Sequence, residues 1–89
     1  MLKVKESQQF RRDVKTCLKR RKDMERFAEV LDILRIPEDL PPKNRAHTMV
    51  GDYIGYRECH IEPDWLLLYR YDEDGLFLYR MGTHSDLFR

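Results

Sequence analysis

The sequence predicts an α+β domain in which two helices pack on a small antiparallel sheet. Apolar residues recur at helical spacing up to residue 34, prolines at 37, 41 and 42 then break the pattern, and the sequence after Gly51 is typical of β-strands. With 89 residues, 42% of them hydrophobic, the chain is long enough for one modest core. We therefore expect a single domain spanning residues 1–89.

Each element has a local reason to form. Residues 2–5 alternate as a short strand would, and Ser7 can cap a helix whose apolar positions begin at Phe10 and follow the i, i+4, i+7, i+8 pattern. Asp23 can cap a second helix, which ends before Pro37. After a proline-rich connector, three strands of an antiparallel meander are expected at 56–62, 65–71 and 76–81.

Charge is distributed unevenly along the chain, although the formal net charge is only +1. Residues 1–22 hold nine Lys and Arg residues against two acids, so the first helix suits a polyanion or an acidic protein. The simpler reading of the same residues is a solvated helix face. The residues of this segment that would contact a polyanionic or acidic partner are Lys15, Lys19, Arg20, Arg21 and Lys22.

The longest apolar run and the spacing of the two cysteines indicate the compartment and the redox state of the protein. The longest apolar run, residues 65–69, is far shorter than the roughly 20 residues that span a bilayer, so we expect no membrane association and a cytoplasmic protein. Cys17 and Cys59 lack the close spacing of redox or zinc motifs. Both are expected to be free thiols.

Histidines and acids gather in the sheet region. Strand alternation places Glu58, His60 and Glu62 on one face, and Pro63 ends that strand beside Asp64. Two further histidines, His47 and His84, lie at the boundaries of the predicted sheet, and the helical half contains none. They are either ordinary surface groups or the acid–base groups of an active site.

A pair of histidines can cleave RNA without a metal ion. The reaction needs a base on the 2′-hydroxyl, an acid on the departing 5′-oxygen and a cation over the phosphate. The arginines beyond residue 45 are candidates for the cation. These arginines are Arg57, Arg70, Arg80 and Arg89. Because Arg57 faces away from His60, we favour Arg70 or Arg80 as the cation over the phosphate.

Two metal-dependent alternatives fit less well. A zinc site would use Cys59 and His60, but adjacent strand residues point to opposite faces. A magnesium nuclease could use Glu58, Glu62 and Asp64, but no lysine follows Lys43 to accompany them.

Two segments, "GDYIGYRECHIEPDWLLLYR" and "RMGTHSDLF", closely resemble the YafQ-like branch of the RelE/ParE superfamily. The segments "FRRDVK", "KRRKDM" and "LPPKNRAH" also lie where that family has its two helices and the connector to its sheet. The resemblance implies a RelE-like fold and the toxin of a type II toxin-antitoxin system. Such a toxin is a ribosome-dependent endoribonuclease that cuts mRNA without a metal or cofactor.

Carried over residue by residue, the resemblance implies the catalytic set His47, Glu58, His60, Asp64 and His84. His84 resembles the general acid, while His60 and Asp64 resemble the groups that handle the 2′-hydroxyl and hold the site together. Relatives often have aspartate where this chain has Glu58 and where it has Ala46. His47 would position RNA or phosphate.

The resemblance also implies partners. These are the ribosome with its mRNA, and an acidic, partly disordered antitoxin with a DNA-binding N-terminal part, in a hetero-oligomer. Phe88 could stack on an unpaired base, whereas Trp65 is expected in the core. The alternative is a non-catalytic binding toxin, such as the gyrase inhibitors of the same superfamily, or an interaction module. The joint presence of His60, Asp64 and His84 favours the ribonuclease.

Overall fold

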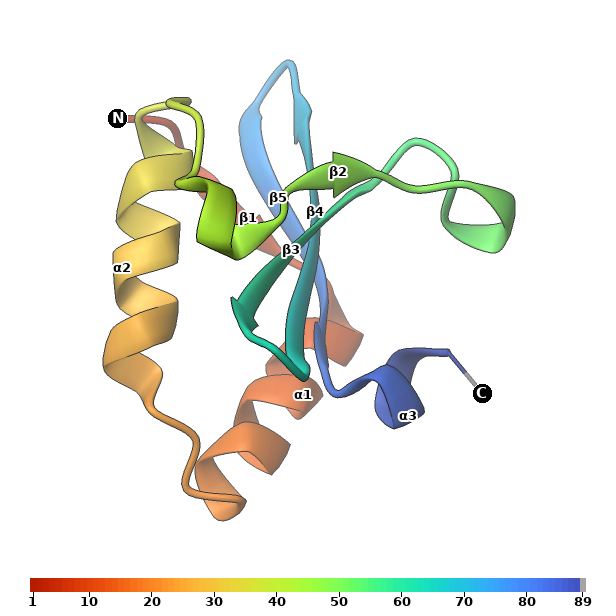
Figure 1. The fold of residues 1–89 in the computed structure, drawn as a ribbon. Helices are drawn as coiled ribbons and strands as arrows, with labels where there is room; N and C mark the ends of the chain where they lie inside the picture. The colour runs from red at the N-terminus through yellow and green to blue at the C-terminus, as the bar shows by residue number, and fades with distance from the viewer. Residues whose placement is uncertain (89) are drawn as a thin grey trace.

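The computed structural model of the protein describes residues 1–88, in which helices lie on both faces of a five-stranded sheet (Figure 1). This confirms the α+β class. The elements are β1 (Val4–Glu6), α1 (Gln8–Lys19), α2 (Met24–Arg35), the 3₁₀ turn η1 (Pro42–Asn44), β2 (His47–Thr48), the 3₁₀ turn η2 (Gly51–Tyr53), β3 (Arg57–Glu62), β4 (Trp65–Asp72), β5 (Gly75–Gly82) and α3 (His84–Leu87).

The sheet has the strand order β1-β5-β4-β3-β2. The chain from β3 to β5 is the predicted antiparallel meander, and β1 joins it parallel to β5. Gly75 makes this junction possible, because its φ is +134° and a Cβ there would lie 2.4 Å from the carbonyl oxygen of Lys3. The predicted first strand is shifted to Val4–Glu6. The two-residue strand β2 is too short to give a periodic signal.

Side-chain caps begin both long helices, and the cap of α1 also bonds to the sheet. The Ser7 hydroxyl accepts a hydrogen bond from the Phe10 amide and donates one to the Tyr79 carbonyl of β5 at 2.6 Å. Asp23 accepts from the Glu25 amide at the start of α2, and α2 ends at Arg35, two residues before Pro37. Both predicted caps are therefore confirmed.

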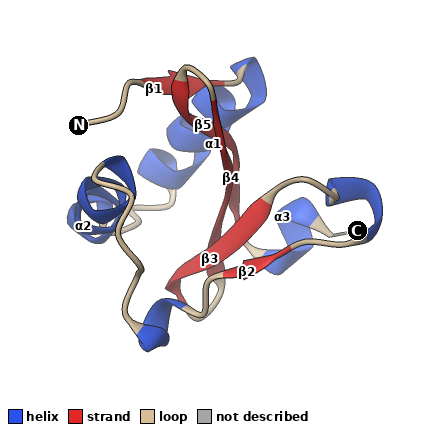
Figure 2. Cartoon of the chain, turned by 90° about the horizontal axis from the view of Figure 1, so that it is seen from above, coloured by secondary structure: helices blue, strands red, loops and turns tan. Residues whose placement is uncertain are grey.

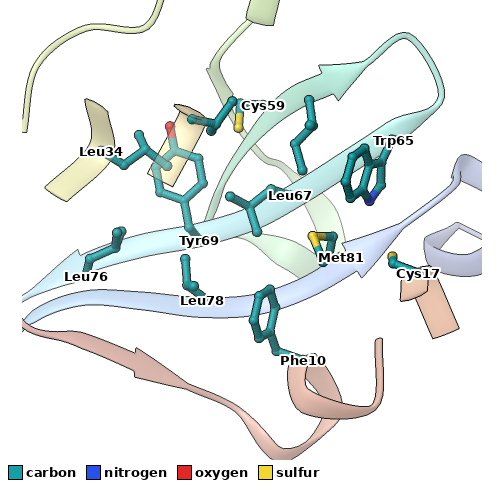
Figure 3. Close-up of a cluster of buried hydrophobic side chains, with 12 residues drawn as sticks. Phe10, Cys17, Leu34, Cys59, Trp65, Leu67, Tyr69, Leu76, Leu78 and Met81 are labelled. Carbon is teal, nitrogen blue, oxygen red and sulfur yellow. The ribbon is translucent and has the colours of Figure 1, made fainter. Parts of the chain in front are cut away.

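The main core lies between the sheet and the two long helices (Figure 3). Trp65 is fully buried in it, which confirms the packing role expected for that residue. Cys17 and Cys59 are both buried and free, again as expected. Other buried members are Phe10, Val30, Leu34, Ile61, Leu67, Tyr69, Leu76, Leu78 and Met81.

The opposite face of the sheet has a smaller cover. Figure 2 shows α2 and α3 on opposite sides of the sheet. On the α3 side Leu66, Leu68 and Leu87 form a small buried cluster, with Met49, Tyr53 and Tyr79 packed against it. This side of the sheet is called the open face below. Within residues 1–88, no helix is long and apolar enough to cross a membrane.

Candidate functional site

Three of the predicted site residues meet at the end of the sheet formed by β2 and β3. Antiparallel pairing sets His47 directly opposite Glu58, and His60 lies two residues further along β3. The Nε2 atom of His47 is 3.4 Å from Glu58 Oε1, and the Nε2 atom of His60 is 3.5 Å from the same oxygen. One carboxylate oxygen is thus shared by two imidazoles.

Glu58 is unusual for an acid because its side chain is only 6% exposed. Its Oε2 atom is buried and has no hydrogen-bond partner within the described part of the chain. The side chain of His60 is 11% exposed, whereas that of His47 is 50% exposed. A buried charge without full pairing costs stability, so this position is a candidate for a functional carboxylate.

Backbone carbonyls fix the orientation of both rings. Nδ1 of His47 donates to the Arg45 carbonyl at 2.9 Å, and Nδ1 of His60 donates to the Pro63 carbonyl at 3.1 Å. Since a carbonyl can only accept, Nδ1 carries the proton in each ring and Nε2 is left to take up or release a second one. Both exchangeable nitrogens therefore face Glu58.

The other two predicted catalytic residues form a second pair. Nδ1 of His84 donates to Asp64 Oδ1 at 2.5 Å, and the backbone amide of His84 donates to the same oxygen at 2.9 Å. These bonds, the backbone bond foremost, lower the pKa of Asp64. The side chain of His84 is 54% exposed, and its Nε2 remains available for proton exchange.

The two groups are adjacent, because the ring centroids of His60 and His84 are 5.8 Å apart. We call the five residues His47, Glu58, His60, Asp64 and His84 the histidine cluster. Sequence reasoning grouped Glu62 with Glu58 and His60, but within residues 1–88 Glu62 forms no ion pair with the histidine cluster. The strand register shifts between His60 and Glu62, and Glu62 instead lies 3.6 Å from Arg26 of α2.

Helix α3, which carries His84, is anchored to α1 and β5. Thr83 and Asp86 form a reciprocal capping box, and Arg20 of α1 donates two hydrogen bonds to Asp86 at 2.6 and 3.1 Å. The Arg20 bonds hold the pKa of Asp86 well below its ordinary range. Sequence reasoning missed this anchor, although a threonine three residues before an aspartate is a capping-box signal.

The predicted arginines have different surroundings. The guanidinium of Arg80 donates to Asp13 at 2.9 and 3.3 Å, so it is held in a partly buried ion pair. Arg70 is exposed on β4, where it lies over the rings of Tyr56 and Phe77. Arg89 lies outside the described residues.

The basic residues of α1 and the turn after it are mostly exposed. Lys15, Lys19 and Arg21 are exposed, and Arg20 is engaged by Asp86. Lys22 lies 5.9 Å from the ring centroid of Trp65 and contributes to the low pKa of Asp64. Lys22 is therefore a cation close to the histidine cluster, in addition to the arginines considered from the sequence.

The last predicted contact residue, Phe88, is 39% exposed, and its ring centroid is 6.3 Å from that of His84. A hollow of about 480 Å³ adjoins His60 on the α2 side. It is lined by charges of both signs, including Arg26, Lys43 and Glu62. Among residues 1–88, no three His, Cys, Asp or Glu side chains are placed so that they could hold a metal ion.

Residues 2–89 match a protein family whose description is "Bacterial toxin of type II toxin-antitoxin system, YafQ". The mRNA interferase toxin YafQ of Escherichia coli K12 is 38% identical over 88 residues, which are 96% of this chain and 94% of that protein.

Solved structures agree with this match. The chain is similar to the toxin in the E. coli DinJ-YafQ complex, with a TM-score of 0.90, 36% identity and full coverage of both chains. It is also similar to a metal-bound toxin from Helicobacter pylori, with a TM-score of 0.92 and 38% identity over 99% of this chain and 100% of that one.

Proposed function

The chain belongs to the YafQ family of bacterial type II toxins, and we propose that it is an endoribonuclease that cleaves mRNA on the ribosome and so inhibits translation. One observation carries the proposal. The His84–Asp64 pair lies beside the Glu58–His60 pair, with ring centroids 5.8 Å apart, so an acid and a base can act on opposite sides of one phosphate.

In the proposed reaction the 2′-oxygen of the RNA attacks the adjacent phosphorus while the bond to the 5′-oxygen breaks. The 2′-proton goes to the base and the 5′-oxygen receives a proton from the acid. The products are a 2′,3′-cyclic phosphate and a 5′-hydroxyl. We assign the acid to His84, because Asp64 holds Nδ1 and leaves the exposed ring to donate from Nε2.

The base is assigned to His60 acting with Glu58. Proton transfer to Nε2 of His60 creates a cation 3.5 Å from the Glu58 carboxylate, which stabilises the charge as it forms. His47 contacts the same carboxylate and is more exposed, so we assign it to binding the RNA phosphate or the 2′-hydroxyl. Lys22 is the candidate cation for the phosphate.

Partners and location belong to the same proposal. The exposed basic residues of α1 suit ribosomal RNA or an acidic antitoxin segment, and one face can serve both if the antitoxin blocks access to the ribosome. The E. coli relative has been crystallised with DinJ. For this chain we propose a cognate, partly disordered antitoxin with a DNA-binding part, a toxin–antitoxin hetero-oligomer, and action in the cytoplasm without a metal.

The reaction can be tested on a short mRNA bound to ribosomes. One substrate carries a single 2′-deoxynucleotide on the 5′ side of the scissile phosphate, and its matched control is all-ribose. We expect the control to be cut, also in excess EDTA, to a product with a 2′,3′-cyclic phosphate, and the deoxy substrate to stay intact. Cleavage of the deoxy substrate, or a requirement for a divalent ion beyond that of the ribosome, would contradict the mechanism.

A further inference from the structure

A row of aromatic side chains crosses the open face of the sheet, starting next to the histidine cluster. We call Phe88, Tyr53, Tyr79, Tyr56 and Phe77 the aromatic row. They come from the C-terminal segment, η2, the loop before β3, and β5. The reaction steps proposed above use none of these rings, so the row needs its own explanation.

The row starts at the proposed general acid. The ring of Phe88 is 6.3 Å from that of His84, and it meets Tyr53 edge-on at 5.6 Å. The Tyr53 hydroxyl donates to the carbonyl of Leu87 at 3.0 Å, which fixes the ring against α3. This end of the row is therefore rigidly placed relative to His84.

From Tyr53 the row continues over the sheet. Tyr53 and Tyr79 meet edge-on at 6.2 Å, and Tyr79 stacks on Tyr56 with centroids 4.4 Å apart and planes 17° from parallel. Phe77 follows at 6.3 Å from Tyr79. No step between neighbouring rings exceeds 6.3 Å, so the row is continuous from the histidine cluster to the middle of β5.

Arg70 lies at the end of the aromatic row that is farther from His84. The guanidinium carbon of Arg70 is 5.1 Å from the ring centroid of Tyr56 and 4.9 Å from that of Phe77. Its Nη1 donates to the Tyr56 hydroxyl at 3.2 Å. Within residues 1–88, no carboxylate lies within ion-pairing distance of Arg70, so its charge is available to a ligand.

The rings of the row are only half-buried, in contrast to the leucines beneath them. Tyr53, Tyr56, Phe77 and Tyr79 have intermediate exposure, Phe88 is 39% exposed, and Arg70 is exposed. Core packing on this face is already supplied by the fully buried Leu66 and Leu68. Partly exposed rings ending in an unpaired arginine have the composition of surfaces that hold single-stranded nucleic acid.

We propose that the aromatic row binds unpaired bases of the RNA strand as it leaves the scissile phosphate, with Arg70 contacting base or phosphate at its far end. This inference rests on the proposed function and extends it to the path of the substrate. We commit to RNA as the occupant because the first ring of the row contacts His84, so a strand bound at the proposed general acid has the neighbouring rings beside it. Aromatic faces stack on any base, so the row would increase the affinity for RNA without setting a sequence preference.

Tyr79 gives the sharpest test because it contacts three members of the row. Tyr79→Leu keeps an apolar side chain over the sheet but removes the ring, and Tyr79→Phe is the matched control that keeps the ring. Fluorescence anisotropy with labelled single-stranded RNAs of 4 and about 12 nucleotides would give the dissociation constants. For loss of one base stack we expect Tyr79→Leu to bind the longer RNA about 5- to 100-fold more weakly than wild type. Tyr79→Phe should stay within about twofold, and the 4-nucleotide RNA should be less affected.

Cleavage on ribosomes, assayed in parallel, separates this inference from the proposed function. If wild type leaves mRNA intact but binds the longer RNA through Tyr79, the nuclease proposal fails and the row stands. If Tyr79→Leu is folded by circular dichroism and binds and cleaves RNA like wild type, the row is overturned. A Tyr79→Leu protein that remains toxic but escapes neutralisation by its antitoxin would make the row a protein interface and would also overturn the proposal.

Discussion

Glu58→Gln separates function from stability at the centre of the histidine cluster. The buried carboxylate lies 3.4 and 3.5 Å from two imidazole nitrogens, and its Oε2 atom has no partner among the described residues. Glutamine has nearly the same shape but no charge. We therefore expect it to weaken catalysis and to strengthen the fold.

The magnitudes follow from the geometry. Glu58 is a buried carboxylate whose effective desolvation costs several kcal/mol, and a buried amide in its place costs about 1–3 kcal/mol. Glu58→Gln should then raise the free energy of unfolding by about 1–2 kcal/mol at pH 8. Each kcal/mol corresponds to a rise in Tm of about 4–8 °C. The same charge matters during the reaction, because a protonated His60 3.5 Å away would interact favourably with it by about 5 kcal/mol at an effective dielectric constant of 20.

Cleavage should respond in the opposite direction. Losing the charge that stabilises a protonated His60 removes much of the benefit of the base, so we expect a rate about 100- to 10,000-fold lower. Thermal unfolding at pH 8 and single-turnover cleavage on ribosomes would measure both effects. Glu62→Gln is the matched control on the same strand, since Glu62 is 29% exposed and faces Arg26. A Glu58→Gln protein that is less stable at pH 8 and cleaves like wild type would refute the reasoning.

Three further predictions concern the supports of the site. Asp86→Asn removes an acid whose pKa is lowered in the folded state, so its stabilisation is fully present above the ordinary aspartate pKa of about 3.9 and fades as the pH falls further. Urea unfolding should show a deficit of about 1 kcal/mol at pH 7 that becomes smaller as the pH is lowered below about 3.9. Gly82→Ala places a Cβ 2.8 Å from Asp86 Oδ2, so it should displace α3 and reduce cleavage more than about 10-fold while costing about 1–3 kcal/mol; a melting curve and a cleavage rate both equal to wild type would contradict this. Asp13→Ala leaves Arg80 and the Met81 amide without their acceptor, so Tm should fall by about 12–24 °C for a loss of about 3 kcal/mol, and an unchanged Tm would mean that the pair contributes nothing.

Periodicity predicted the long elements because their own residues determine them. The caps at Ser7 and Asp23 and the apolar, aromatic run of β4 are local signals, and each was found where the sequence indicated. The short elements were missed for the same reason. β2 has two residues and α3 has four, so neither completes enough of a period to be recognised.

The grouping of the site residues was predictable only in part. Strand alternation placed Glu58 and His60 together, but the contact between Asp64 and His84 joins residues 20 positions apart and depends on the turn into α3. The register shift between His60 and Glu62 has no signal in the sequence. The capture of Arg80 by Asp13 joins α1 to β5 over 67 positions, so charge counting could not distinguish Arg80 from a free cation.

The most direct test of the central claim is primer-extension mapping of an mRNA translated in a cell-free system, with wild-type protein, with His84→Ala, and with ribosome-free RNA as a control. The account predicts codon-phased cuts that require ribosomes and that fall about 100-fold or more in His84→Ala. Intact mRNA with the wild-type protein, or undiminished cutting by His84→Ala, would contradict it.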